Sequence, residues 1–301
     1  MDKAQEMASF VAVVEAGSFV GAADSLGLSK AAVSRQVGDL ERRLGSRLLH
    51  RTTRRLSLTD DGQLFFERAK DLLAAIDEAE SEIASRSGEA VGRLRINAPL
   101  SFGMRHLAPL WGRFADRHPK VFLDIDLSDR LVDLVEEGYD LAVRINDLRS
   151  SQLISRQLAS SRMVLCASPE YLARQGVPEH PRELSEHRVI SYRYWSTGDD
   201  WTFTGPDGEV RVTTHPRFHT NNGDTCRAAA LDHQGIILQP DFLVGDDLRR
   251  GALVELLPSF ASPTIGIHAV YPSRKFLPIR TRRMVDFLVE AFATPSWRDA
   301  T

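Results

Sequence analysis

The apolar positions of the first sixty residues recur at helical spacing in three short runs. The first run is spaced i, i+3, i+4 and i+7 and consists of Met7, Phe10, Val11 and Val14. Residues 19–26 and 33–44 repeat this spacing, which is typical of amphipathic helices. Glycines stand where helices end, at Gly17 and Gly27, and serines stand where helices begin, at Ser18 and Ser29. The pattern predicts a helix-turn-helix unit.

The third predicted helix carries small and basic residues opposite its apolar face. With a rotation of about 100° per residue, the face opposite Val33 and Leu40 holds Ala31, Ser34, Arg35, Gly38 and Arg42. A helix that enters the major groove of DNA needs small residues for close approach and hydrogen-bonding residues for the base edges. The candidate DNA-contacting residues of this helix are Ser29, Lys30, Ala31, Ser34, Arg35 and Gln36. The same face also suits the solvated side of an ordinary three-helix unit.

A basic run follows this helix. It contains six arginines and no acid, namely Arg42, Arg43, Arg47, Arg51, Arg54 and Arg55. Alternating apolar residues at 56–58 predict a short β wing next to it. Guanidinium and hydroxyl donors suit phosphate oxygens, so Arg51, Thr52, Arg54 and Arg55 are candidate phosphate contacts. Most basic runs are solvated faces, but the position after a helix-turn-helix favours DNA.

The order of these residues resembles the winged helix-turn-helix of LysR-type transcriptional regulators. The resemblance is ungapped over about sixty positions and includes Phe19, Ala22, Ala23, Leu26, Leu28, Ser29, Ala32, Val33, Ser34, Arg35, Gln36, Val37, Leu40, Glu41, Leu44, Gly45, Leu48, Leu49, Arg51, Thr52, Thr53, Arg54, Leu58, Thr59 and Gly62. It implies a sequence-specific DNA-binding protein. Gly38 is unfavourable inside a helix, because glycine has a low helix propensity. Either DNA approaches the backbone at this position, or the glycine is simply tolerated.

A long helix is predicted after the wing, over residues 60–88. Its apolar seam has the 4, 3, 4, 3, 4 spacing of a coiled coil and consists of Phe65, Ala69, Leu72, Ile76, Ala79 and Ile83. We expect a second copy of the chain to cover this seam in a homodimer. The alternative is that the seam packs on the chain's own C-terminal domain. The family resemblance further implies a dimer of dimers, that is, a homotetramer.

Strands and helices alternate in the remaining residues, which predicts a doubly wound parallel sheet. The expected strands are 94–97, 121–127, 141–145, 163–167, 236–238 and 266–271, and the expected helices are 102–117, 131–137, 171–175, 225–233, 241–248 and 277–293. The runs 167–172, 251–254 and 271–273 continue the resemblance to LysR-type regulators. The resemblance implies a two-lobed α/β effector domain similar to periplasmic binding proteins.

The expected fold class is therefore α plus α/β, in three parts. Residues 1–59 form the winged helix-turn-helix, 60–88 the linker helix and 89–301 the effector domain. Within the effector domain we expect one lobe at about 92–161 and 265–301 and the other at about 162–264.

Two helix starts at the carboxyl ends of predicted strands indicate a binding site for a small anion. Helix N-termini offer free N–H donors and partial positive charge, and such crevices hold ligands in open α/β sheets. The candidate effector-binding residues are Pro99, Leu100, Ser101, Phe102, Ser128, Arg144, Asn221 and Asn222. Asp224 would repel an anion, so we expect it to cap its helix. Capping and loop hydrogen bonds are the ordinary alternative for each of these residues.

Composition adds mostly exclusions. The chain has 301 residues, a net charge of −3 and two cysteines, so it is not a disulfide-stapled secreted scaffold. We expect no signal peptide and no transmembrane helix, and hence a cytoplasmic, nucleoid-associated protein. No catalytic, metal or nucleotide motif is present, so we expect no enzyme activity and no metal or other cofactor. Cys226 lies in a predicted first helical turn, where a thiolate is favoured, but redox sensing with Cys166 is disfavoured by their separation.

These observations favour a transcription regulator that binds double-stranded DNA and responds to a small, anionic effector. Its further expected partners are a second copy of itself and RNA polymerase, with no membrane contact. One alternative is a solute-binding module or enzyme with a vestigial N-terminal domain. Another is an architectural DNA-binding protein without a ligand, for which the cleft between the lobes would be sealed.

Overall fold

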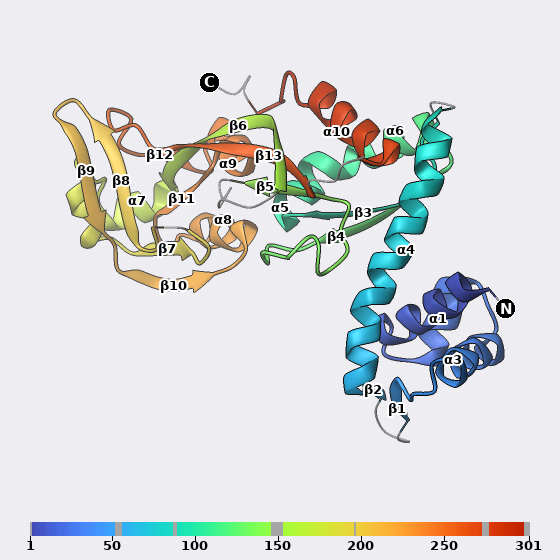
Figure 1. Cartoon of the computed structure of the whole chain (residues 1–301). Helices are drawn as coiled ribbons and strands as arrows, with labels where there is room; N and C mark the ends of the chain where they lie inside the picture. The colour runs from blue at the N-terminus through green and yellow to red at the C-terminus, as the bar shows by residue number, and fades with distance from the viewer. Residues whose placement is uncertain are drawn as a thin grey trace. The chain divides into compact units, whose positions relative to one another are not determined.

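The computed structural model describes residues 2–51, 56–86, 89–145, 153–195, 197–272 and 277–297. Contacts divide the chain into two compact units, Met1–Gly88 and Glu89–Thr301 (Figure 1). Each unit has its own hydrophobic core.

The first unit is built from helices with a small β hairpin. Its elements are α1 (Lys3–Glu15), α2 (Phe19–Leu26), α3 (Lys30–Leu44), β1 (Leu49–Arg51), β2 (Leu56–Leu58) and α4 (Asp60–Arg86). Ser18 and Ser29 cap α2 and α3 by accepting backbone N–H groups, and Gly27 and Gly45 end these helices in the left-handed conformation. The three helices predicted from periodicity are therefore present with the expected caps. Strands β1 and β2 pair antiparallel.

The core of the first unit includes part of the linker helix. Phe10 of α1 is fully buried and packs against Phe65 and Phe66 of α4, with ring centroids 5.8 and 6.4 Å apart. By contrast, Leu72 and Ile76 are 52% and 39% exposed. The predicted seam is thus divided: its first residues pack on the chain's own helices, while the next two face away from that core.

The second unit contains a seven-stranded mixed sheet rather than the expected parallel one. The strands of this sheet are β3 (Gly92–Ala98), β4 (Val121–Leu127), β5 (Leu141–Ile145), β6 (Leu153–Ala167), β11 (Ile237–Pro240), β12 (Val254–Glu255) and β13 (Thr264–Pro272). The order is β11-β6-β13-β5-β3-β4, and β12 also pairs with β6. Strand β3 is parallel to β4 and β5, whereas β13 is antiparallel to β5 and β6 because the chain returns through it from the second lobe.

Smaller elements complete the second lobe. Two further two-stranded sheets are formed by β7 (Val189–Tyr192) with β10 (Pro216–Thr220) and by β8 (Asp200–Gly205) with β9 (Gly208–Thr213). A separate hydrophobic cluster around Met163, Trp201 and Phe203 lies in this region. The long strand β6 pairs with β13 through Arg162 and with β11 from Met163 onward, so one strand serves both lobes.

Helices cover the sheets of the second unit. They are α5 (Leu100–Phe102), the π-helix η1 (Gly103–Leu107), α6 (Ala108–Arg117), α7 (Pro169–Gln175), the 3₁₀ helix η2 (Pro181–Ser185), α8 (Gly223–Leu231), α9 (Asp241–Arg249) and α10 (Ile279–Ala291). The single helix expected at 102–117 is divided by η1, where the Ala108 N–H reaches back to the Gly103 carbonyl. Pro109 has no N–H to donate, which favours this wider turn.

The helix predicted at 131–137 is wrong. The segment forms turns, in which the side chain of Asp133 accepts the backbone N–H groups of Val135 (2.9 Å) and Glu136 (3.0 Å). Such local side-chain hydrogen bonds compete with helix formation. The segment leads into Leu141, the first residue of β5.

Candidate functional site

Helix α3 has one buried face and one accessible face, as its sequence predicts. Val33, Val37 and Leu40 are fully buried. Ala31 and Arg35 are exposed on the other side. Lys30 is also exposed, and Ser34 and Gly38 are half-buried. The accessible surface therefore offers small side chains, a hydroxyl group and two cations in the first half of the helix.

Two other candidates on α3 already make structural contacts. The Ser29 hydroxyl accepts the N–H of Ala32 at 3.2 Å and so caps the helix. The Oε1 atom of Gln36 accepts a hydrogen bond from the buried Ser9 hydroxyl of α1. Ser29 and Gln36 thus help to hold the helix in place.

The basic run is partly neutralised within the first unit. Arg42 pairs with Asp39 at 2.6 Å, and Arg43 pairs with Glu6 of α1 at 2.8 Å. The periodicity of α3 alone does not reveal the second pair, because Glu6 lies on another helix. Of the predicted phosphate contacts, Thr52, Arg54 and Arg55 lie outside the described residues, as does the side chain of Arg51.

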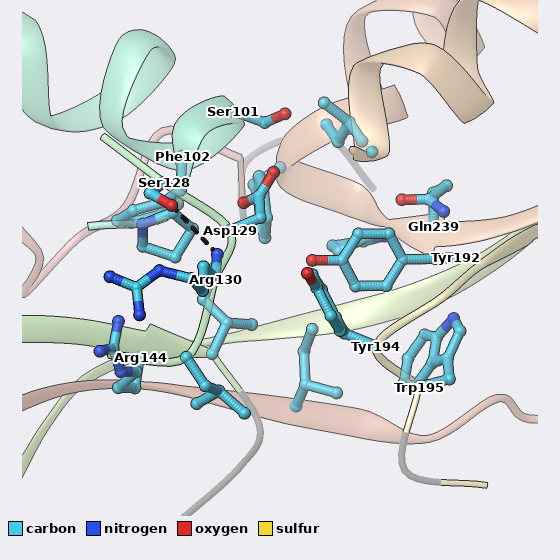
Figure 2. A pocket seen from close by; sticks show the side chains of 18 residues that line it. Ser101, Phe102, Ser128, Asp129, Arg130, Arg144, Tyr192, Tyr194, Trp195 and Gln239 are labelled. Atoms are coloured by element: carbon cyan, nitrogen blue, oxygen red, sulfur yellow. Dashed lines mark hydrogen bonds between the residues drawn. The ribbon is translucent and has the colours of Figure 1, made fainter. Parts of the chain in front are cut away.

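A cavity of about 140 Å³ lies in the second unit, where several predicted residues meet (Figure 2). Five of the eight candidates line it, namely Pro99, Ser101, Phe102, Ser128 and Arg144. The other lining residues are Asp129, Arg130, Leu131, Ile145, Tyr192, Tyr194, Trp195, Gly223, Gln239, Pro240, Phe242, Leu243 and Ile265. Leu100, Asn221 and Asn222 are not part of the lining.

Four of the five aromatic residues that line this pocket were not predicted from the sequence, and Phe102 is the exception. Tyr192 ends β7, Tyr194 and Trp195 follow it, and Phe242 lies in α9. The rings of Tyr192 and Tyr194 are 5.8 Å apart and nearly perpendicular. The closely spaced aromatic residues at 192–195 are a signal in the sequence, but their place beside Ser101 and Arg144 depends on the fold.

The first predicted anion-binding helix start is occupied by the protein's own carboxylate. Asp129 accepts the backbone N–H of Leu100 at 3.1 Å and the side-chain N–H of Asn222 at 3.3 Å. Burial raises the pKa of Asp129, and these two hydrogen bonds oppose that rise. Leu100 and Asn222 therefore position Asp129.

The expected cap of the second helix start is also corrected. Asn222, not Asp224, caps α8, and its Oδ1 atom accepts the Thr225 N–H at 3.0 Å. Asp224 instead pairs with Arg105 at 2.5 Å. The Asn222 side chain can make both contacts because it has an acceptor and a donor. The acceptor caps α8, and the donor reaches Asp129.

Arg144 and Arg130 both line the pocket, but their environments differ. The Arg144 guanidinium donates to Oδ1 of Asn97 at 2.6 Å and to the Val132 carbonyl at 3.4 Å. Burial lowers its pKa. No carboxylate among the described residues forms an ion pair with Arg144, whereas Arg130 makes two hydrogen bonds with Glu137, at 2.5 and 3.0 Å.

The described residues form neither a reactive thiolate nor a metal site nor a membrane-spanning helix. Burial raises the pKa of the Cys226 thiol to about 12 and raises that of Cys166 as well, so the expected thiolate at Cys226 is not favoured. No three His, Cys, Asp or Glu side chains among the described residues are placed to hold a metal ion. The described helices include none with the length and apolarity needed to cross a bilayer.

Comparison with known families agrees with both halves of this architecture. The family model described as "Bacterial regulatory helix-turn-helix protein, lysR family" matches residues 4–63, and that described as "LysR substrate binding domain" matches residues 87–293. The chain belongs to the LysR family of transcriptional regulators. The LysR-type fold, with its helix-turn-helix and two-lobed regulatory domain, is thereby confirmed.

Individual LysR-type proteins resemble the chain over nearly its whole length. The transcriptional regulator PtxR of Pseudomonas aeruginosa is 39% identical over 292 residues, covering 96% of this chain and 93% of PtxR. The solved structure of CrgA from Neisseria meningitidis has a TM-score of 0.62 and 36% identity, covering 98% of this chain and all of CrgA (100%). That of the Vibrio cholerae virulence activator AphB has a TM-score of 0.65 and 29% identity, covering 96% and 99%.

Proposed function

We propose that this LysR-type regulator reads duplex DNA with the accessible face of α3. The observation that carries the proposal is the complete burial of Val33, Val37 and Leu40, which leaves Lys30, Ala31, Ser34 and Arg35 on the accessible side. Small and hydrogen-bonding residues at the start of such a helix suit the major groove. The proposed phosphate contacts are Arg51, Thr52, Arg54 and Arg55, with Ser29 and Gln36 supporting α3.

The pocket of the second unit is the proposed effector site. Its cavity argues against a sealed cleft, and with it against a purely architectural role. Pro99, Ser101, Phe102, Ser128 and Arg144 face the effector, a small anion, while Leu100 and Asn222 act through Asp129. Asn221 is exposed next to Asn222 and stays a candidate. Binding changes regulation without chemical conversion of the ligand.

The proposed domain roles follow from these two sites. Residues 1–59 bind DNA, 60–88 dimerise and 89–301 bind the effector. Leu72 and Ile76 of α4 are exposed apolar residues, and a second copy of α4 would cover them. Two DNA-binding units would then contact two half-sites, and the bound regulator would act on RNA polymerase as a dimer or tetramer.

Binding to the DNA upstream of the protein's own gene tests the proposal. We expect fluorescence anisotropy to show affinity that falls steeply with salt, because Lys and Arg release counterions from phosphate. Arg35→Ala and Ser34→Ala should change the preferred base at one or two positions of each half-site. Arg174→Ala, an exposed arginine on α7, is the matched control and should leave binding unchanged. Binding that is absent, or that does not respond to salt, would contradict the proposal.

A further inference from the structure

The size and walls of the pocket favour one ring. The cavity measures about 140 Å³, and an apolar cavity of about 150 Å³ in another protein holds benzene. Phe102, Tyr192, Tyr194, Trp195 and Phe242 contribute five aromatic walls. Aromatic side chains pack well against a second ring at their edges and faces. A planar ring thus fits both the volume and the surfaces.

The charge at one end of the pocket favours an anion. Figure 2 shows Arg130 and Arg144 on the same side of the pocket, opposite Tyr192, Tyr194 and Trp195. Glu137 neutralises Arg130, but no described carboxylate pairs with Arg144. A guanidinium has five N–H donors, and the bonds to Asn97 and Val132 leave some of them for a ligand. A partly buried cation that no described carboxylate contacts directly is unfavourable, so a ligand carboxylate is a suitable partner for Arg144.

Another part of the pocket excludes a second anion. Asp129 lines the cavity and is held by Leu100 and Asn222. An ionised carboxylate accepts about four hydrogen bonds, so Asp129 still accepts one from a ligand O–H or N–H. A second carboxylate placed there would be repelled. The hydroxyl ends of Tyr192 and Tyr194 point toward this region and offer further hydrogen bonds (Figure 2).

We propose that the effector is a single-ring aromatic acid with one carboxylate, which binds Arg144, and one O–H or N–H donor, which binds Asp129. This inference rests on the proposed function only in taking the pocket as the effector site. In this arrangement the ligand carboxylate meets the positive charge of Arg144, and the ligand donor meets the negative charge of Asp129. Aliphatic dicarboxylates and aromatic amines each satisfy one of the two residues and conflict with the other.

Calorimetry with the full-length protein and simple probes tests the ligand class. The probes are 3- and 4-hydroxybenzoate, benzoate, isophthalate, terephthalate and 4-hydroxybenzyl alcohol. We expect one of the two hydroxybenzoates to bind tightest, with benzoate several-fold weaker. The two dicarboxylates and the neutral alcohol should be weaker by about tenfold or more, because each loses or opposes a charge-assisted hydrogen bond.

Two variants assign the charges to residues. Arg144→Gln should weaken hydroxybenzoate binding about tenfold and leave the neutral alcohol unaffected. Asp129→Asn should improve the binding of terephthalate or isophthalate, since the repelling charge is removed. Arg113→Gln and Asp116→Asn on α6 are matched controls, because both side chains are exposed and neither lines the pocket. The melting temperature of each variant reports whether it is folded.

Several outcomes overturn the inference. Dicarboxylates that bind as well as hydroxybenzoate, affinities that do not depend on charge, and a failure of every probe to bind at 10 mM (roughly the weakest affinity that calorimetry resolves) each contradict the ligand class. DNA binding by the same preparation separates this failure from that of the proposed function. A protein that binds its DNA but none of these probes retains its regulatory role with a different effector class.

Discussion

The guanidinium of Arg144 donates a hydrogen bond from Nη1 to the Oδ1 atom of Asn97 at a distance of 2.6 Å. Asn97 lies near the C-terminal end of β3 and is fully buried, and its own side-chain N–H reaches the Asp126 carbonyl at 3.4 Å. An amide oxygen orients the guanidinium without neutralising it. Arg144 therefore keeps its charge for a ligand.

Replacement of Asn97 by aspartate should neutralise the pocket from within. Asn97→Asp places a carboxylate beside Arg144, and the resulting internal ion pair competes with a bound anion. We expect affinity for hydroxybenzoate to fall about tenfold, while the neutral 4-hydroxybenzyl alcohol binds as before. Calorimetry measures both. An equal loss for both probes would mean that Asn97 has a merely structural role.

The pair between Arg43 and Glu6 should stabilise the first unit. Glu6 is 3% exposed, and Arg43 is its cationic partner from α3. Arg43→Met would leave a buried carboxylate without its counter-charge, which costs about 3 kcal/mol. Arg42→Met is the matched control, since Arg42 is largely exposed and its loss should cost about 0.5 kcal/mol.

The two units can be followed separately in the full chain. All four tryptophans, Trp111, Trp195, Trp201 and Trp297, lie in the second unit. Tryptophan fluorescence during urea unfolding therefore reports on that unit, and circular dichroism also follows the helices of the first. Arg43→Met should shift the dichroism transition and leave the fluorescence transition in place. If Arg42→Met and Arg43→Met shift the dichroism transition equally, the buried ion pair stabilises the first unit no more than the exposed one does.

Gly38 offers a stabilising substitution. A Cβ atom at this position would meet nothing within 4 Å, and the residue lies inside α3. Gly38→Ala should stabilise the first unit by about 0.5–1 kcal/mol, because alanine has less backbone freedom to lose. Urea unfolding followed by circular dichroism measures the gain, and a loss of stability would contradict it. A simultaneous fall in DNA affinity would place the DNA against this backbone, whereas unchanged affinity would place Gly38 outside the interface.

Acid should destabilise the second unit through four partly buried histidines. Burial lowers the pKa of His106, despite a hydrogen bond to the Phe242 carbonyl at 3.1 Å. Burial also lowers the pKa values of three further histidines, namely His118, His187 and His268. The unfolded chain therefore binds more protons near pH 6, so this contribution to stability is complete above about pH 6.5 and is lost as the pH falls.

Melting followed by tryptophan fluorescence between pH 5 and 7.5 (roughly the range in which histidine titrates) measures this loss. The His106 ring lies 4.7 Å from that of Trp297, so the probe is close to the titrating group. His106→Gln should melt with a smaller dependence on pH. His215→Gln, which changes an exposed residue, should retain the full dependence. An unchanged slope in His106→Gln would assign the effect to other groups.

The sequence by itself determined the elements in which apolar and polar side chains recur at a regular, short spacing. The buried face of α3, the serine caps and the terminal helix could be predicted because residues three or four apart share a helix face, and this relation is present in the sequence. Local patterns also explain the error at 131–137, where the Asp133 side chain replaces helical hydrogen bonds with its own. The family resemblance supplied the two-lobed architecture.

The tertiary structure decided the chemistry of the pocket. Asn222 and Asp129 are 93 residues apart, and Arg105 and Asp224 are 119 apart, yet each pair is in contact. No periodicity relates such residues, because their contact depends on how β6 and β13 return the chain between the lobes. That return places the Asp129 carboxylate at the start of α5 and the aromatic walls around the pocket. It also leaves Arg144 without an ion-paired carboxylate among the described residues. The sequence thus indicated a small-molecule site, and only the packing of distant segments showed which charges it presents.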